Sequence, residues 1–117
     1  MFKILFFTDK NGNVPIKEYI YELGDKGKTD KSSRIQFTKI MRYINLLEKT
    51  GTRIGKPTVE HLRGDIWELR PLQHRILFAW ITAEQVFVLL HHFIKKTQKT
   101  PIREIEQAEK NLIKYLQ

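Results

Sequence analysis

The sequence contains no cysteine and no long apolar run, and it has few acidic residues. Without cysteine there is no disulfide framework and no thiolate metal site, and nothing indicates an oxidising compartment. The apolar start of the chain ends at Asp9, short of the length that a secretory signal needs. No segment approaches the roughly 18 consecutive apolar residues of a membrane span. We therefore expect a cytoplasmic protein without a membrane partner.

The charge is strongly unbalanced, with 21 Lys and Arg against 13 Asp and Glu and a formal net charge of +8. A surface with this excess attracts polyanions, so nucleic acid is the first class of partner to consider. The 117 residues, of which 41% are hydrophobic, suffice for one core. We therefore expect residues 1–117 to form a single domain.

The first half of the chain predicts one strand followed by two helices. Residues 4–7 form a short β-prone run that ends in turn-forming residues. Residues 13–23 place apolar side chains at the spacing of an amphipathic helix, and Gly24 follows as a stop signal. Residues 30–50 keep the same spacing in a longer, basic helix that Gly51 closes.

The second half predicts three strands and a helix. Residues 66–70, 75–81 and 85–93 are rich in β-branched and aromatic side chains and are separated by short gaps, as in an antiparallel meander. Thr100 and Pro101 then mark the start of a terminal helix. The order β-α-α-β-β-β-α predicts an α+β domain: a small antiparallel sheet with two N-terminal helices and a C-terminal helix. We expect the helices on one face and the other face open for a ligand.

Arg70 and Arg75 are the first candidate functional residues. If residues 71–74 form the loop between the first two meander strands, the two arginines oppose each other on one face. Two opposed like charges cost stability unless a carboxylate or a phosphate lies between them. A pair of guanidinium groups suits a phosphate, which favours an anion clamp. The alternative is that Glu68, on the same face, neutralises one arginine.

The next hairpin brings one histidine to the arginine face. Depending on the register of this hairpin, Arg75 faces His91 or His92. The His91-His92 pair does not suit a metal site, because adjacent strand residues point to opposite faces of the sheet. Four cations without an acid follow these histidines: Lys95, Lys96, Lys99 and Arg103. On the opposite face the pattern places three aromatic residues, predicted to be core rather than base-stacking platforms: Trp67, Phe78 and Trp80.

Four segments carry a likeness to a known family: Asp65-Ile-Trp-Glu-Leu-Arg70, Arg75-Ile-Leu-Phe78, Leu89-Leu-His-His-Phe-Ile-Lys-Lys-Thr-Gln-Lys-Thr-Pro101 and Arg103-Glu-Ile-Glu-Gln-Ala108. With them, residues 62–115 resemble the phage-related, HigB-like branch of the RelE/ParE toxin superfamily. The stretch from Phe93 to Pro101 is the most specific part, whereas the helical half before Lys56 matches only in layout.

This resemblance implies a RelE-like fold and the toxin of a type II toxin–antitoxin system. Such a toxin is an mRNA interferase, a ribosome-dependent endoribonuclease that inhibits translation by cutting mRNA in the ribosomal A site. It uses no metal or other cofactor, and a ribose 2′-hydroxyl attacks the adjacent phosphate. Arg70 and Arg75 then resemble the arginines that hold the scissile phosphate, and His92, favoured over His91, resembles the acid–base group. Lys95 and Tyr115 are the other candidates for that last role. The residues expected to hold RNA are His91, Lys95, Lys96, Lys99 and Arg103.

The same resemblance implies a cognate HigA-like antitoxin with a helix-turn-helix, through which alone operator DNA is bound. The other expected partners are mRNA and the ribosome, with the long basic helix contacting ribosomal RNA. Two other functions stay open from the sequence: a ParE-like, non-enzymatic poison of DNA gyrase, and a passive RNA- or ribosome-binding module. Arg70, Arg75 and a histidine favour the nuclease over the gyrase poison, and a ribosome-dependent cleavage assay would separate the nuclease from the passive module.

Overall fold

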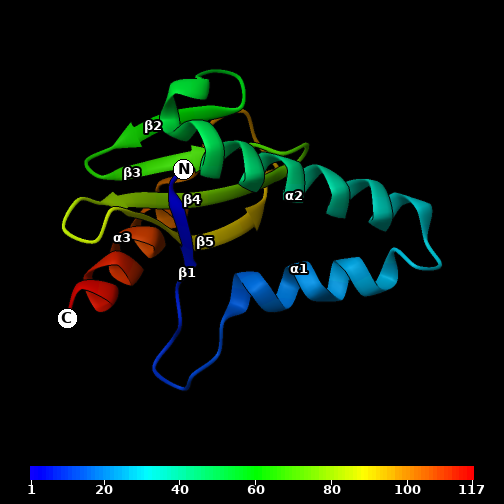
Figure 1. Ribbon diagram of the computed structural model, residues 1–117, viewed down its shortest axis with the longest axis horizontal. Coiled ribbons are helices and arrows are strands. Elements are labelled where there is room, and N and C mark those ends of the chain that lie inside the picture. The colour runs from blue at the N-terminus through cyan, green and yellow to red at the C-terminus, as the bar shows by residue number, and fades with distance from the viewer.

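The computed structural model describes residues 1–117 and has the predicted α+β class (Figure 1). Its elements follow in the order β1 (Lys3–Phe6), α1 (Pro15–Lys26), α2 (Lys31–Thr50), the short 3-10 helix η1 (Gly51–Ile54), β2 (Val59–Arg63), β3 (Ile66–Leu69), β4 (His74–Ile81), β5 (Val86–Ile94) and α3 (Ile102–Leu116). None of the helices combines the length and the apolar composition that a membrane-spanning helix needs.

One sheet holds all five strands in the order β1-β5-β4-β3-β2. The meander β3, β4, β5 is antiparallel as predicted, but β1 runs parallel to β5, so the sheet is mixed. Strand β2, which pairs with β3, was not predicted. Glu60, His61 and Arg63 make β2 polar, as is common for an edge strand, and thereby hide its strand pattern. The direction of β1 depends on a partner some 80 residues later, which no local pattern reveals.

Helices cover both faces of the sheet, so the expectation of one open face is wrong. The hairpin of α1 and α2 lies on one face and α3 on the other (Figure 1). Each side has its own core: Ile40, Leu47 and Phe78 belong to the first, and Leu77 and Ala108 to the second. The signal for two covered faces lies in β4 and β5, whose nearly continuous apolar runs are typical of strands buried on both sides.

The unequal lengths of β1 and β5 leave part of the sheet edge uncovered. The backbone amide of Phe7 makes the last bond to β5, donating to the carbonyl of Leu89 at 2.9 Å. Strand β5 continues to Ile94 without a neighbour on that side. The edge of residues 90–94 therefore lies between the start of α1 and helix α3.

Candidate active site

Arg70 and Arg75 lie on the α3 face of the sheet, around a buried carboxylate. The register that pairs Leu69 with Ile76 brings the two arginines opposite each other just beyond β3, as predicted. Glu68 lies between them, with its Oε1 3.1 Å from Nε of Arg70 and 4.0 Å from Nε of Arg75. The hydroxyl of Thr100 donates to the other carboxylate oxygen. The structure thus has a carboxylate where the anion clamp would hold a phosphate.

Arg75 is enclosed by the protein, whereas Arg70 reaches the surface. The residue Arg75 is only 7% exposed, and its Nη1 donates to the carbonyls of Leu72 and His74 at 2.8 and 2.7 Å. Burial lowers the pKa of Arg75, against the influence of Glu68, but the guanidinium stays charged. Arg70 also pairs with Glu60 at 2.8 Å. The positive charges of the two arginines are therefore balanced by the negative charges of two glutamates. A catalytic role for the arginines stays a prediction.

The hairpin register differs from both predicted alternatives, because Arg75 lies opposite Phe93. A bulge causes the difference: Leu77 pairs with His91, but the next residue, Phe78, pairs with Leu89. His91 is consequently the histidine that shares the arginine face. His92 turns to the α1–α2 face, so the three predicted catalytic residues Arg70, Arg75 and His92 are not brought together.

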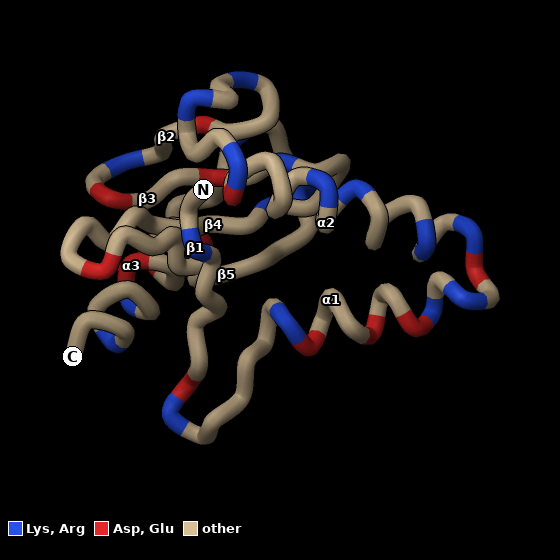
Figure 2. Tube along the Cα trace, viewed as in Figure 1, with Lys and Arg blue, Asp and Glu red and all other residues tan.

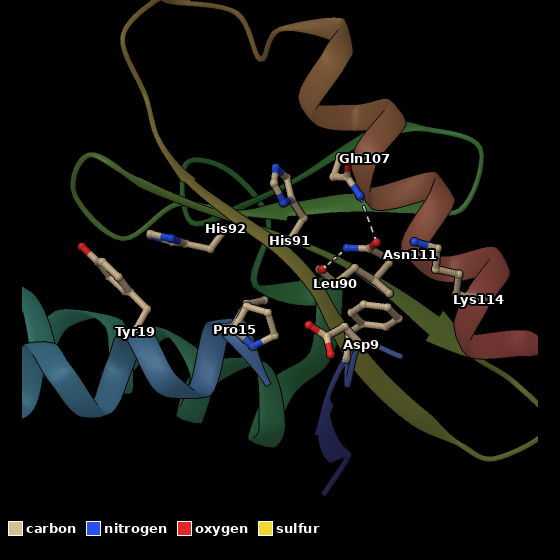
Figure 3. Close-up of a pocket in the computed structure, with 11 residues that line it drawn as sticks. Asp9, Pro15, Tyr19, Leu90, His91, His92, Gln107, Asn111 and Lys114 are labelled. Carbon is tan, nitrogen blue, oxygen red and sulfur yellow. Dashed lines mark hydrogen bonds between the residues drawn. The ribbon is translucent and has the colours of Figure 1, made fainter. Parts of the chain in front are cut away.

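Both histidines border one pocket of about 560 Å³ at the free edge of β5 (Figure 3). His92 points toward α1 and His91 toward α3, so the two rings approach the edge from opposite faces of the sheet. The lining consists of Phe7, Asp9, Pro15, Ile16, Tyr19, Leu90, His91, His92, Gln107, Asn111 and Lys114. We name this region, at the edge of residues 90–94, the β5-edge pocket.

A chain of hydrogen bonds fixes the ring of His92. The amide oxygen of Gln36 accepts from Gln73 at 3.0 Å and from Nε2 of His74 at 2.8 Å. His74, fully buried, must then present an unprotonated Nδ1, which lies 3.0 Å from Nε2 of His92. His92 therefore donates its Nε2 proton to His74, and its Nδ1 carries the free lone pair. The ring of Tyr19 packs against His92 with the centroids 4.3 Å apart.

This surrounding keeps His92 neutral. Burial, with smaller contributions from His74 and His91, lowers the pKa of His92 to about 4, and burial likewise lowers the pKa of His74. Burial also raises the pKa of Tyr19, so its phenol stays protonated. At neutral pH the α1 side of the pocket accordingly offers an imidazole base and a phenol donor.

The α3 side of the pocket contributes a second histidine with a carboxylate partner. Nε2 of His91 lies 2.8 Å from Oε1 of Glu104. Further along α3, Gln107 donates to Asn111, whose amide donates to the carbonyl of Leu90 at 2.8 Å and so ties the helix to β5 (Figure 3). Lys114 is the single Lys or Arg in the lining and supplies positive charge for an anion.

Several of the residues around the β5-edge pocket were not predicted from the sequence. On α3 a signal existed, because Glu104, Gln107, Asn111 and Lys114 recur at intervals of three and four, which forms a polar stripe on one side of a helix. No comparable signal marks Tyr19 or His74. Their approach to His92 depends on how α1 and α2 pack on the sheet.

The predicted RNA-holding cations lie in and after the loop between β5 and α3. Lys95, Lys96, Lys99 and Arg103 are all exposed, and none forms an ion pair. Lys99 and Arg70 line a shallow depression of about 380 Å³ with Glu60. The loop therefore presents uncompensated positive charge next to the strand that carries both histidines.

The other candidates lie away from this pocket. The hydroxyl of Tyr115 donates to Glu84 in the turn between β4 and β5, and burial together with this bond raises the pKa of Tyr115 to about 12. Phe78 belongs to the core on the face opposite the arginines, as predicted, whereas Trp67 and Trp80 lie on the same face and pack against the edge of that core. Phe78 is fully buried, whereas the two tryptophans are only half-buried.

One protein family matches the chain. Its model, described as Phage derived protein Gp49-like (DUF891), matches residues 27–113. The matched part contains α2, strands β2 to β5 and most of α3, and thus His74, His91 and His92, but not Tyr19 or Lys114. No curated protein gives a significant match.

Proposed function

We propose, because this chain belongs to the phage-derived Gp49-like family, that it is the toxin of a type II toxin–antitoxin pair. The family is RelE-like and toxin-like, which supports a role as a toxin. We further propose that the chain is an mRNA interferase that cuts translated mRNA on the ribosome. The nuclease proposal differs from a gyrase poison or a passive RNA-binding module in requiring an acid–base site.

The observation that carries this proposal is the state of His92 in the β5-edge pocket. Its Nε2 is committed to His74, its Nδ1 is left as a base, and its pKa is low enough that the ring is neutral. A phosphate bound nearby would raise that pKa toward neutrality, because an anion within about 4–6 Å favours imidazolium. A base with a pKa closer to the working pH is more effective.

Cleavage of RNA by its own 2′-hydroxyl needs one base and one acid. In the proposed reaction, Nδ1 of His92 takes the 2′-hydroxyl proton while the 2′-oxygen attacks the adjacent phosphorus. The bond from phosphorus to the 5′-oxygen breaks, and His91, when it carries both ring protons, gives one to that oxygen. The products are a 2′,3′-cyclic phosphate and a 5′-hydroxyl. Lys114 and the phenol of Tyr19 stabilise the added negative charge.

The ribosome provides the second part of the proposal. Figure 2 shows basic positions recurring along α2, and no residue of this helix lines the β5-edge pocket. Together with the exposed cations of residues 95–103, they give the protein a positive surface for ribosomal RNA, whose affinity falls as salt rises. The proposed regulatory partner is a HigA-like antitoxin with a helix-turn-helix, which also brings the complex to operator DNA.

Primer extension on a defined mRNA, with and without translating ribosomes, tests the nuclease proposal. We expect the wild-type protein to cut only when ribosomes translate the message. His92→Gln keeps a side chain able to donate to His74 but removes the base, so cleavage should fall about 10²- to 10⁴-fold. His91→Gln should reduce it through loss of the acid.

His61→Gln is the matched control, because His61 is exposed on β2 and does not line the β5-edge pocket; its ring bonds to the carbonyl of Gly64 and packs against Trp67. This variant should cut like the wild type. Cleavage that is equal in the wild type and His92→Gln would contradict the assignment of the base. If the wild type cuts under no condition, the nuclease proposal is wrong, and a gyrase supercoiling assay becomes the next measurement.

A further inference from the structure

A second pocket lies on the α1–α2 face of the sheet, where α2 ends, and its lining combines aromatic rings with cations. It has a volume of about 670 Å³, within the range of small-molecule sites. Apart from Met1 and the residues at 50–52, it is lined by Phe2, Lys49, Arg53, Trp67, Trp80 and Phe87. We name it the tryptophan pocket. It is distinct from the β5-edge pocket, because Phe87 and His92 are five residues apart on β5, about 17 Å in an extended strand.

Local contacts hold the tryptophan pocket in a fixed shape. The amide of Phe2 donates to the carbonyl of Glu48 at 2.7 Å, which ties the start of β1 to the end of α2. At Gly51, with φ of +69°, a Cβ would lie 2.9 Å from the ring of Phe2. Glycine therefore allows the chain to pass close beside the aromatic cluster.

The aromatic rings leave part of their surface available. Phe2 meets Trp80 edge to face, with centroids 5.5 Å apart and an interplanar angle of 90°. Phe87 is tilted by 56° to Trp80, so no ring within the chain stacks in parallel on this indole. Trp67 and Trp80 are both half-buried and line the pocket. They are therefore poorly explained as core residues alone.

The charge around these rings has one sign. Lys49 and Arg53 are exposed, the lining contains no Asp or Glu, and neither cation forms an ion pair. A ligand that matches both features carries flat π-surfaces and negative charge together. An unpaired stretch of RNA has this chemistry, because its bases stack on aromatic side chains while its phosphates bind Lys and Arg.

We propose that the tryptophan pocket binds one or two unpaired nucleobases of single-stranded RNA, with the flanking phosphates on Lys49 and Arg53. This inference shares its ligand class with the proposed function, but it concerns a separate site and requires no cleavage. The pocket would hold RNA at a second point, away from the histidines. An acidic peptide could satisfy the cations but would not need indole faces.

Intrinsic fluorescence tests this proposal directly, because Trp67 and Trp80 are the only tryptophans in the chain. The probe is an eight-nucleotide adenine RNA with 2′-O-methyl groups, which cannot react by 2′-hydroxyl attack. Polyphosphate of equal charge and an acidic peptide with leucine side chains serve as comparison ligands. We expect quenching by the RNA and none by polyphosphate.

Two variants separate stacking from charge. Trp80→Leu should weaken RNA binding, followed by fluorescence anisotropy of labelled RNA, by about 5- to 150-fold, the range for loss of one stacked base. The double variant Lys49→Gln with Arg53→Gln should lower the slope of log affinity against log salt by about 1.4, since each phosphate contact on a single strand contributes about 0.7. Its matched control is Lys28→Gln with Lys110→Gln, which removes two exposed cations elsewhere and should leave binding in place.

Three results would overturn the proposal: equal quenching by RNA and polyphosphate, tighter binding of the acidic peptide than of RNA, or RNA affinity unchanged in the double variant. The cleavage assay is independent of these results. Ribosome-dependent cutting without RNA quenching would refute the nucleobase site and leave the nuclease proposal intact. Quenching by RNA without any cutting would support the nucleobase site and refute the nuclease proposal.

Discussion

Replacing Glu68 by Gln tests whether the arginine pair is held by its own carboxylate. Glu68 is fully buried between Arg70 and Arg75 and accepts a hydrogen bond from Thr100. Glutamine keeps the shape and can still accept from Thr100, but it removes the negative charge. Arg75, with a side chain 9% exposed, would then keep only its two backbone carbonyl partners.

The expected cost follows from the burial of this group. Removing one partner of a buried ion pair typically costs about 3–5 kcal/mol, because the other charge is left uncompensated. That is a large share of the roughly 5–15 kcal/mol that stabilises an ordinary domain. Glu60→Gln is the matched control, since Glu60 pairs with the same Arg70 at a partly exposed position and should cost at most about 1 kcal/mol.

Urea unfolding followed by tryptophan fluorescence measures both free energies of unfolding. With a slope of about 2 kcal/mol per molar urea, Glu68→Gln should shift the midpoint down by roughly 2 M. The double variant Glu68→Leu with Arg75→Met should recover most of the loss, because apolar residues can replace a buried ion pair. A loss below about 1 kcal/mol in Glu68→Gln would refute the structural role of this carboxylate.

The same double variant separates the two interpretations of Arg75. If Arg75 only stabilises the fold by pairing with Glu68, the stable double variant should still cleave mRNA. If Arg75 holds the scissile phosphate, as the family resemblance implies, the double variant should fold and lose cleavage. Primer extension on translated mRNA distinguishes these outcomes.

Two more expectations concern stability. His92 has a pKa of about 4 in the folded protein against an ordinary value of 6.5, so the unfolded chain binds this proton first. The contribution of neutral His92 to the free energy of unfolding is therefore complete above pH 6.5 and is lost as the pH falls toward 4. Calorimetry should show a lower melting temperature at pH 5 than at pH 7. The difference between the two melting temperatures should be smaller in His92→Gln. Gly51→Ala should destabilise the protein more than Gly12→Ala in urea unfolding. Both have positive φ, but only at Gly51 does a Cβ meet another side chain, Phe2. Equal losses at the two glycines would show that the contact with Phe2 carries no cost.

The elements with strong periodicity could be predicted from the sequence, and so could the face on which Trp67 and Phe78 lie. The position of the site could not, because it depends on two non-local features. The bulge between Leu77 and Phe78 decides which histidine joins Arg75 on its face, and no residue type in the hairpin reveals it. The short reach of β1 along β5 decides that the edge stays free, and strand length is poorly encoded locally.

The place of β5 in the sheet has a consequence for biosynthesis. Strand β5 is made last among the strands, yet it lies between β1 and β4 and carries both histidines. Strand β1 therefore waits for its partner until residues 86–89 have been made, so the pairing that completes the sheet is of high contact order. A nascent chain that stops before β5 lacks both histidines and the strand that joins β1 to the rest of the sheet. The proposed toxin would thus become competent only after β5 has been synthesised and paired with β1.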